Sequence, residues 1–194
     1  MNEQLKAQLL QMVEEDRRVR AQLVSTGELY KGYAPQMAAV HLQNAQQLEA
    51  IIGMWGWPGK TLVGEEGTGA AWLIVQHAIG SPNFQRMCLP LLKEAVACGE
   101  AEPAQVAYLE DRIAFYERRP QRYGTQFDWD EHGKMSPWTL ADSQRVDEYR
   151  RLVGLGPLVE KVREAREGTK HETPPDFQKR QEEFIAWARS VGWL

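Results

Sequence analysis

The chain has 194 residues, of which 43% are hydrophobic, enough to bury one core of ordinary size. Its 23 basic and 27 acidic residues give a net charge of -4 without the Lys/Arg excess that phosphate-backbone binding needs, so we expect no nucleic acid partner. No stretch approaches the roughly 20 apolar residues of a membrane helix, and the charged N-terminus lacks the apolar core of a signal peptide. We therefore expect no membrane partner and a cytoplasmic location, with both cysteines reduced.

The N-terminal half predicts three helices. Apolar residues recur at spacings of three and four over residues 2–25 and again over 35–52, which is the period of an amphipathic helix. A third run, 70–77, begins with six residues that are apolar on every side, as in a helix enclosed by protein. Between the last two runs, proline and several glycines in 55–69 predict a loop, anchored in the core by tryptophans such as Trp55.

The C-terminal half predicts more helices and one hairpin. Periodic runs cover 82–98 and 103–117, and aromatic and polar residues then alternate around a turn near 126–140, which indicates a small β-hairpin. Two shorter helices follow, up to about residue 166. A last helix over 176–191 carries a broad apolar stripe that includes Phe177, Phe184 and Trp187.

These elements together predict a mainly α fold, a single-domain bundle of about seven helices with the hairpin. We divide the chain into a helical domain with a polar pocket (1–167), a polar linker (168–175) and a C-terminal helix (176–194). That last helix is expected to dock on the body or on a partner.

The end of the enclosed helix carries the residues best suited to catalysis. His77 is a candidate general acid or base, because the unperturbed pKa of histidine lies closest to neutrality. Asp111 is a candidate to orient it and Arg112 to hold negative charge, while Gln76 and Tyr108 are expected to bind the ligand. As an alternative, carbonyls at the helix end hold His77, and Asp111 and Arg112 form an ordinary ion pair.

The segment 121–126 gathers amide, guanidinium, phenol and hydroxyl groups around Gly124. Such a loop can present several donors to an anion or a carbonyl oxygen. We expect four of its side chains to bind the ligand: Gln121, Tyr123, Thr125 and Gln126. In the alternative, Gly124 takes a positive φ and the amides cap the preceding helix.

The first two helices add further polar residues. Asp16 and Asn44 are expected to join the ligand-binding set. Asp16, His41, His77 and Asp111 would be compatible in type with a metal site built from four helices. No HExxH or paired Glu-x-x-His spacing is present, so the sequence assigns no metal ligands and leaves the cofactor open.

Several motifs carry a resemblance to a known family: Gly56-Trp57-Pro58, Gln76-His77-Ala78 with Phe84-Gln85, Ala107-Tyr108-Leu109 with Asp111-Arg112, and Gln121 followed by Tyr123-Gly124-Thr125-Gln126. In this combination the chain resembles a bacterial family of unknown function over about residues 5–160. The resemblance implies an aspartate followed by an arginine in the first helix, which Asp16 and Arg20 match. It also implies an acidic residue ahead of the asparagine of the second helix, where this chain has His41. A common pocket is implied, but no activity.

The favoured interpretation is a protein that binds a small polar or anionic molecule in a His/Arg/Gln pocket, as a hydrolase or a transferase. The alternative is a non-catalytic interaction module, or a homo-oligomer formed through the C-terminal helix. The sequence does not decide between an enzyme and a binding protein. The pocket hypothesis requires that side chains far apart in the sequence meet at one accessible hollow.

Overall fold

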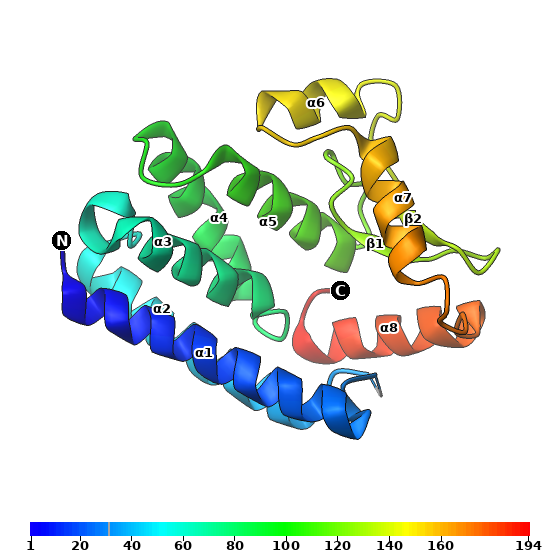
Figure 1. Cartoon of the computed structure of the whole chain (residues 1–194), viewed down its shortest axis with the longest axis horizontal. Coiled ribbons are helices and arrows are strands. Elements are labelled where there is room, and N and C mark those ends of the chain that lie inside the picture. Colours follow the sequence, from blue (N-terminus) through cyan, green and yellow to red (C-terminus); the bar gives the residue numbers. More distant parts are fainter. Residues whose placement is uncertain (31) are drawn as a thin grey trace. The chain divides into compact units, whose positions relative to one another are not determined.

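The computed structural model describes residues 1–30 and 32–194. Within them the chain is mainly helical, with eight α-helices and a small antiparallel hairpin, which confirms the predicted fold class (Figure 1). The backbone separates into two compact units, residues 1–102 and 103–194, which we describe one at a time. The single-domain organisation stays a prediction.

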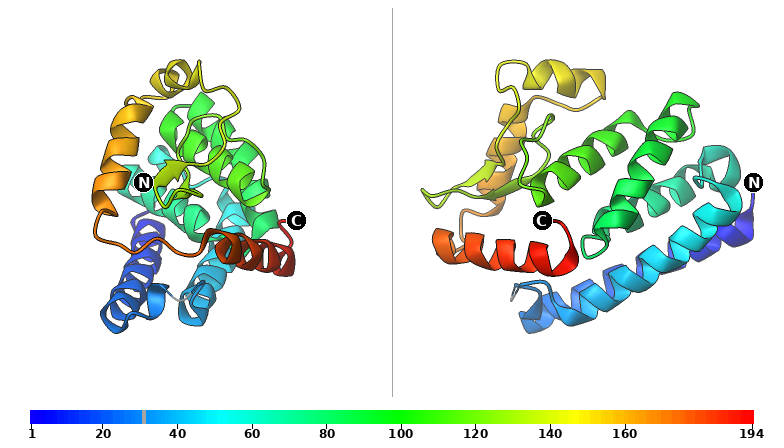
Figure 2. Two further views of the ribbon diagram at one scale, coloured as in Figure 1. Left: turned by 90° about the vertical axis from the view of Figure 1, so that its right-hand side faces the viewer. Right: turned by 180° about the vertical axis from the view of Figure 1, so that it is seen from behind.

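The first unit is built from helices alone. They are α1 (Glu3–Thr26), the short 3-10 helix η1 (Glu28–Tyr30), α2 (Pro35–Trp55), α3 (Lys60–His77) and α4 (Pro82–Ala97). The side chain of Asn2 caps α1, and prolines open α2 and α4, where a missing N–H costs nothing. Helix α1 packs against α2 and α3, and it runs alongside α2 (Figure 2).

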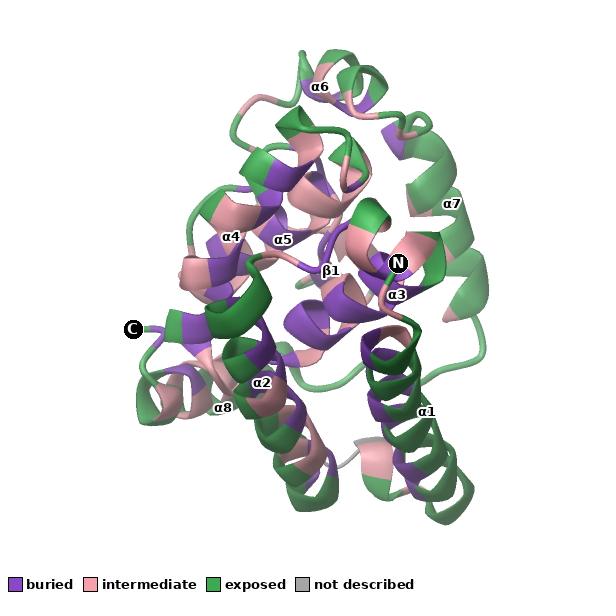
Figure 3. Ribbon diagram, turned by 90° about the vertical axis from the view of Figure 1, so that its left-hand side faces the viewer, coloured by how far each residue is buried: buried purple, intermediate pink, exposed green. Residues whose placement is uncertain are grey.

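Helix α1 is amphipathic, with one buried face and one exposed face (Figure 3). The buried face is apolar at every position but one: Leu5, Leu9, Met12, Val13, Asp16, Val19 and Leu23. Asp16 is only 3% exposed. A carboxylate in such a stripe loses its hydration and must find partners inside the protein.

The prediction of a loop over 55–69 is wrong for residues 60–69. Only residues 56–59 are irregular; the chain is helical again from Lys60, with a kink at Gly64 (φ 72°, ψ 174°). The side chain of Glu100 accepts a hydrogen bond of 2.7 Å from the backbone N–H of Thr61, so it satisfies a donor that the first turn of α3 leaves open. A remote cap of this kind has no local sequence signature.

The helical glycine Gly67 has a packing role. A Cβ at this position would lie 2.6 Å from Cβ of Val63 and 3.5 Å from Cγ of Lys6 on α1. The absent side chain therefore makes room for Val63 of the same helix, across the kink at Gly64, and this offsets the entropy cost of a glycine inside a helix.

Trp55 is not the core anchor that we expected. Its side chain is 54% exposed, at the end of α2. Trp57 is partly buried and donates a hydrogen bond of 3.3 Å to Oγ1 of Thr68. Of these two tryptophans, Trp57 therefore ties the 56–59 loop to α3.

The second unit contains four helices and the hairpin. They are α5 (Pro103–Tyr116), β1 (Phe127–Trp129), β2 (Met135–Pro137), α6 (Val146–Leu152), α7 (Leu158–Gly168) and α8 (Phe177–Val191). The strands pair antiparallel, with Phe127 opposite Pro137 and Trp129 opposite Met135, as the predicted hairpin requires.

Phe184 and Trp187 of the apolar stripe of α8 pack inside the second unit, against α5, whereas Phe177 is 36% exposed. Phe184 stacks on Tyr116 with ring centroids 5.8 Å apart, and it meets Phe115 edge-on at 5.2 Å. Trp193, just beyond α8, stacks on the same tyrosine at 5.2 Å. Aromatic contacts of this kind add to the free energy of simple area burial, so α8 is an integral part of its unit.

Both cysteines are free thiols, as predicted, and burial raises the pKa of Cys88 to about 12. Among the described helices, none has the length and the apolar character that a membrane span requires.

Replacing Phe184 by alanine removes the ring that joins α8 to α5. We expect Phe184→Ala to lower the free energy of unfolding by about 3 kcal/mol, because the partly buried site loses both apolar area and ring contacts. Urea denaturation measures the change. Val159→Ala, at a 71% exposed position of the same unit, should cost well under about 1 kcal/mol. Equal costs for the two variants would contradict the assigned role of α8.

Candidate functional site

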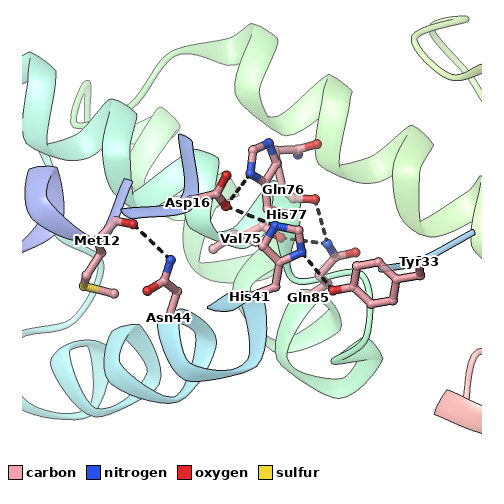
Figure 4. Close-up of polar contacts among 9 residues, drawn as sticks. All are labelled: Met12, Asp16, Tyr33, His41, Asn44, Val75, Gln76, His77 and Gln85. Carbon is pink, nitrogen blue, oxygen red and sulfur yellow. Dashed lines mark hydrogen bonds and ion pairs between the residues drawn. The ribbon is translucent and has the colours of Figure 1, made fainter. Parts of the chain in front are cut away.

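Three helices of the first unit bring Asp16, His41 and His77 together (Figure 4). Asp16 comes from the buried face of α1, His41 from α2, and His77 is the last residue of α3. The potential ligand atoms of these three side chains all lie within 4.8 Å of one another. We call this group the Asp/His cluster.

The last turn of α3 is held in place by Gln85 of α4. Its side-chain amide donates hydrogen bonds to the backbone carbonyls of Val75 (2.7 Å) and Gln76 (3.3 Å). Carbonyls at the end of a helix lack partners within the helix, so this amide supplies what the backbone cannot. Gln85 is completely buried, and it therefore fixes the turn that carries His77.

The Asp16 carboxylate is the centre of the cluster. Its Oδ2 accepts a hydrogen bond from Nδ1 of His77 at 2.8 Å, and Nε2 of His41 lies 3.1 Å from the same oxygen. The N–H direction of His41 does not aim at this oxygen, so the second contact is an ion-pair approach rather than a well-formed hydrogen bond. The two imidazole rings are 5.3 Å apart between centroids.

Burial alone would raise the pKa of Asp16. The contacts with His41 and His77 outweigh this effect and hold the pKa of Asp16 well below its usual range. Asp16 is therefore ionised throughout the neutral range.

Two neighbours orient the cluster. The hydroxyl of Tyr33 lies 2.8 Å from Nδ1 of His41, and the two rings stack. Asn44, one turn beyond His41 on α2, donates a hydrogen bond of 3.2 Å to the backbone carbonyl of Met12 on α1. Asn44 thus joins α2 to α1 next to Asp16, a contact that accounts for its burial.

The donor set suits a transition-metal ion. One carboxylate and two imidazoles are typical ligands of Zn²⁺, Fe²⁺ and related ions, and sites with three protein ligands leave at least one coordination position open. The distances of 2.8 and 3.1 Å approach the spacing of about 3 to 3.5 Å expected of donors that share one ion.

In the second unit, Asp111 binds the 121–126 loop. Its two carboxylate oxygens accept hydrogen bonds from the backbone N–H groups of Arg122, Tyr123 and Thr125, at 2.8 to 3.1 Å, and from the hydroxyl of Thr125 at 3.0 Å. Burial raises the pKa of Asp111, and these hydrogen bonds offset part of that effect. The donors that we expected to face a ligand thus meet a carboxylate of the same unit.

The opposite side of the loop is held by Arg150. This arginine is 1% exposed and donates a hydrogen bond of 2.7 Å to the carbonyl of Tyr123. Gly124 has φ 64°, and a Cβ there would lie 2.9 Å from a methyl carbon of Leu158. This is the positive φ that the structural alternative predicted. The amides bind a side chain of α5 instead of capping its end.

Gln121 completes the loop. Its side chain donates to the carbonyls of Gln126 and Trp138, both at 2.9 Å, and accepts from the backbone N–H of Gln126 at 2.9 Å. The side chain of Gln126 in turn donates to the hydroxyl of Thr125 at 3.0 Å. These contacts are structural; a ligand-binding role for these residues stays a prediction.

The predicted site residues fall into both units. The first unit holds Asp16, Asn44, Gln76 and His77, and the second holds Tyr108, Asp111, Arg112, Gln121, Tyr123, Thr125 and Gln126. A pocket common to both sets stays a prediction, as does the catalytic role of Arg112. The carboxylate hydrogen-bonded to His77 is that of Asp16, in the role that we had given to Asp111. His41 was named only in the group of four residues compatible in type with a metal site. The structure brings three of these four together, Asp16, His41 and His77, while Asp111 belongs to the second unit.

An open groove of about 680 Å³ lies between α1 and α3 of the first unit, lined by residues such as Leu10, Arg17, Gly69 and Leu73. None of the predicted site residues lines it. His77 follows Leu73 one helical turn further along α3.

These observations define a helical protein whose first unit carries an Asp/His cluster. The chain matches the Family of unknown function (DUF6624) over residues 3–170 and belongs to that family. No curated protein and no solved structure matches the chain.

The Asp111 contacts predict a stability effect. Asp111→Asn replaces one acceptor oxygen by an amide that faces N–H donors, so we expect the free energy of unfolding to fall by about 2 to 4 kcal/mol. Asp142→Asn is the matched control: Asp142 caps an exposed turn, where asparagine is an equally good cap, and its cost should stay under about 0.5 kcal/mol. Urea denaturation compares the two variants. An unchanged free energy of unfolding in Asp111→Asn would contradict the structural role assigned to Asp111.

The lowered pKa of Asp16 predicts a pH effect in protein kept metal-free with a chelator. A carboxyl group with a lower pKa in the folded state stabilises the fold above its unfolded pKa of about 3.9, and this contribution is lost as the pH falls toward the folded value. Asp16→Asn should therefore lower the free energy of unfolding by about 2 kcal/mol near pH 6, and by progressively less below about pH 4. Denaturation of both proteins between pH 6 and pH 2 measures this difference, and a constant difference would contradict the assignment.

Proposed function

We propose that the Asp/His cluster binds one divalent transition-metal ion, and that a small polar or anionic molecule binds at the coordination positions which the protein leaves open. Hydrolysis or group transfer is the reaction class that such a centre supports. The observation that carries the proposal is the convergence of Asp16, His41 and His77, from three separate helices, within 4.8 Å.

Charge favours a cation over an anion as the first occupant. With metal-binding imidazoles in their neutral form, the ionised Asp16 leaves the cluster with one negative charge, which repels a free anion. A bound divalent ion changes the net charge of the cluster from negative to positive. The anionic ligand expected from the sequence then becomes compatible with a site built around a buried carboxylate.

The fold alone does not need a carboxylate at position 16. An apolar residue there would complete the buried face of α1 without loss of hydration, and replacing buried charge networks by apolar side chains is often neutral or stabilising. A buried, negatively charged and already oriented donor is what a metal site requires.

Access is from the side of His77. Its side chain is 31% exposed, against 11% for His41 and 5% for Asp16. Asp16 and His41 would hold the ion from the protein interior, and His77 would mark the edge at which a ligand or water enters. A bound divalent ion polarises a substrate oxygen and lowers the pKa of coordinated water.

A second candidate function follows from the hydrogen bond of 2.8 Å between Asp16 and His77. A carboxylate that holds Nδ1 of an imidazole leaves Nε2 free to transfer a proton, as in acid–base catalysis without a metal. Under this alternative, any hydrolysis of a simple ester by the protein would resist a chelator and disappear in His77→Gln. By contrast, the aromatic face of α8 packs on α5, and no contact in the described residues favours it as a partner surface.

Calorimetric titration of chelator-treated protein with Zn²⁺ or Mn²⁺ tests the proposal. We expect one ion per chain, and at a free metal concentration of 100 times Kd a gain in unfolding free energy of about 2.7 kcal/mol. Asp16→Asn, His41→Gln and His77→Gln should each weaken binding by more than about 100-fold, because each removes a direct ligand.

The control is His132→Gln, a histidine with a 74% exposed side chain in the second unit, which should leave the affinity unchanged. Circular dichroism establishes that each variant is folded. The metal centre would be refuted if the wild-type protein bound neither ion. It would also be refuted if the three cluster variants bound the ions as tightly as the wild type does.

A further inference from the structure

Tyr33 contacts the Asp/His cluster without offering a ligand to it. It lies between η1 and α2, with its hydroxyl 2.8 Å from Nδ1 of His41 and its ring stacked on the imidazole at 5.7 Å and 26°. The ring also lies against Gly80, just beyond α3, where a Cβ would be 3.4 Å from Cε1 of Tyr33. Tyr33 is therefore placed by contacts on both sides.

A metal ion bound at Nε2 would fix the tautomer of His41. A neutral imidazole has one N–H, and the nitrogen that binds a metal must offer its lone pair. Nε2 faces Asp16 at 3.1 Å, so Nε2 is the ligand atom and the proton must then reside on Nδ1. Without a metal, a proton on Nε2 would lie beside the Asp16 carboxylate, at the 3.1 Å separation of the two groups.

A phenol hydroxyl can serve both states. It donates to Nδ1 while the proton is on Nε2, and it accepts from Nδ1–H once Nε2 is used by a metal. The imidazole proton moves from Nε2 to Nδ1 through solvent, so its total number of protons stays constant. Phenylalanine could stack in the same place, but it would leave a buried Nδ1–H without an acceptor.

We infer that Tyr33 is a positioning residue that sets the tautomer of His41 and, through it, the affinity of the cluster for metal. This inference rests on the proposed metal centre. It assigns to Tyr33 the function that a carboxylate or a backbone carbonyl performs for most metal-binding histidines.

The test compares wild-type protein with Tyr33→Phe by Zn²⁺ titration and by long-range ¹H–¹⁵N NMR of the histidine rings, which reports the protonated nitrogen directly. We expect Zn²⁺ to bind Tyr33→Phe at least about tenfold more weakly. In the wild type, His41 should carry its proton on Nε2 without metal and on Nδ1 with Zn²⁺. Tyr149→Phe, which changes a tyrosine packed against Arg122 in the second unit, should behave like the wild type.

A double variant separates tautomer control from simple packing. His41→Asp replaces the imidazole by another metal ligand that has no tautomers, so adding Tyr33→Phe to it should not weaken Zn²⁺ binding further. A tenfold loss in the His41→Asp background would overturn the inference, because it would assign the effect to packing. Unchanged affinity in Tyr33→Phe, or a proton on Nε2 of His41 in the Zn²⁺ complex, would also overturn it.

The same measurements distinguish the two proposals. If the wild type binds no metal, the metal centre is refuted and the metal-affinity part of the inference falls with it. The spectra of metal-free protein still decide whether Tyr33 controls the tautomer, since Tyr33→Phe must then alter the population of Nε2–H. If metal binds equally to wild type and Tyr33→Phe, the centre stands and the role of Tyr33 is refuted.

Discussion

The first unit is organised around one buried carboxylate. Asp16 interrupts an otherwise apolar face of α1, and it remains ionised because imidazoles from α2 and α3 approach the same oxygen. The buried charge requires that α2 and α3 bring their imidazoles close to this oxygen. The three helices are therefore held by this polar contact as well as by hydrophobic contacts. The surrounding polar contacts follow from it: Asn44 fixes α2 against α1, and Gln85 fixes the turn of α3 that carries His77.

The second unit also contains a buried carboxylate, but its partners differ from those of Asp16. Asp111 is as deeply buried as Asp16, but its oxygens accept from backbone N–H groups and a hydroxyl, and it has no imidazole beside it. Burial raises its pKa, whereas the pKa of Asp16 is lowered. The contrast separates a carboxylate that shapes a loop from one that is kept charged among metal-ligand side chains.

The sequence predicted the elements whose signals are local. Periodic apolar residues and helix-opening prolines located most helices, and the alternating pattern near residue 127 located the hairpin. It was wrong for residues 60–69, since the cap that starts α3 comes from Glu100, about 40 residues away. Trp55 was misjudged because a tryptophan at a helix end has no pattern that distinguishes a buried ring from an exposed one.

The candidate site was predictable only in part, for the same reason. Residue types alone grouped Asp16, His41, His77 and Asp111 as compatible with a metal site. Which of them meet depends on how the helices pack, and no single helix encodes this. Tyr33 lacked any motif, and only the fold brings it to the cluster. Helical periodicity assigns a residue to a face, whereas a site requires knowledge of which faces meet.

The contacts that hold the 121–126 loop in place affect how experiments on this segment should be interpreted. Asp111 holds its amides, Arg150 holds one of its carbonyls, and Gly124 has no room for a side chain. Random mutagenesis scored by activity in cells would flag this segment as strongly as a catalytic centre, because destabilised variants are degraded and their concentration falls. Only the activity per folded molecule, with protein abundance measured alongside, distinguishes a scaffold from the chemistry that it supports.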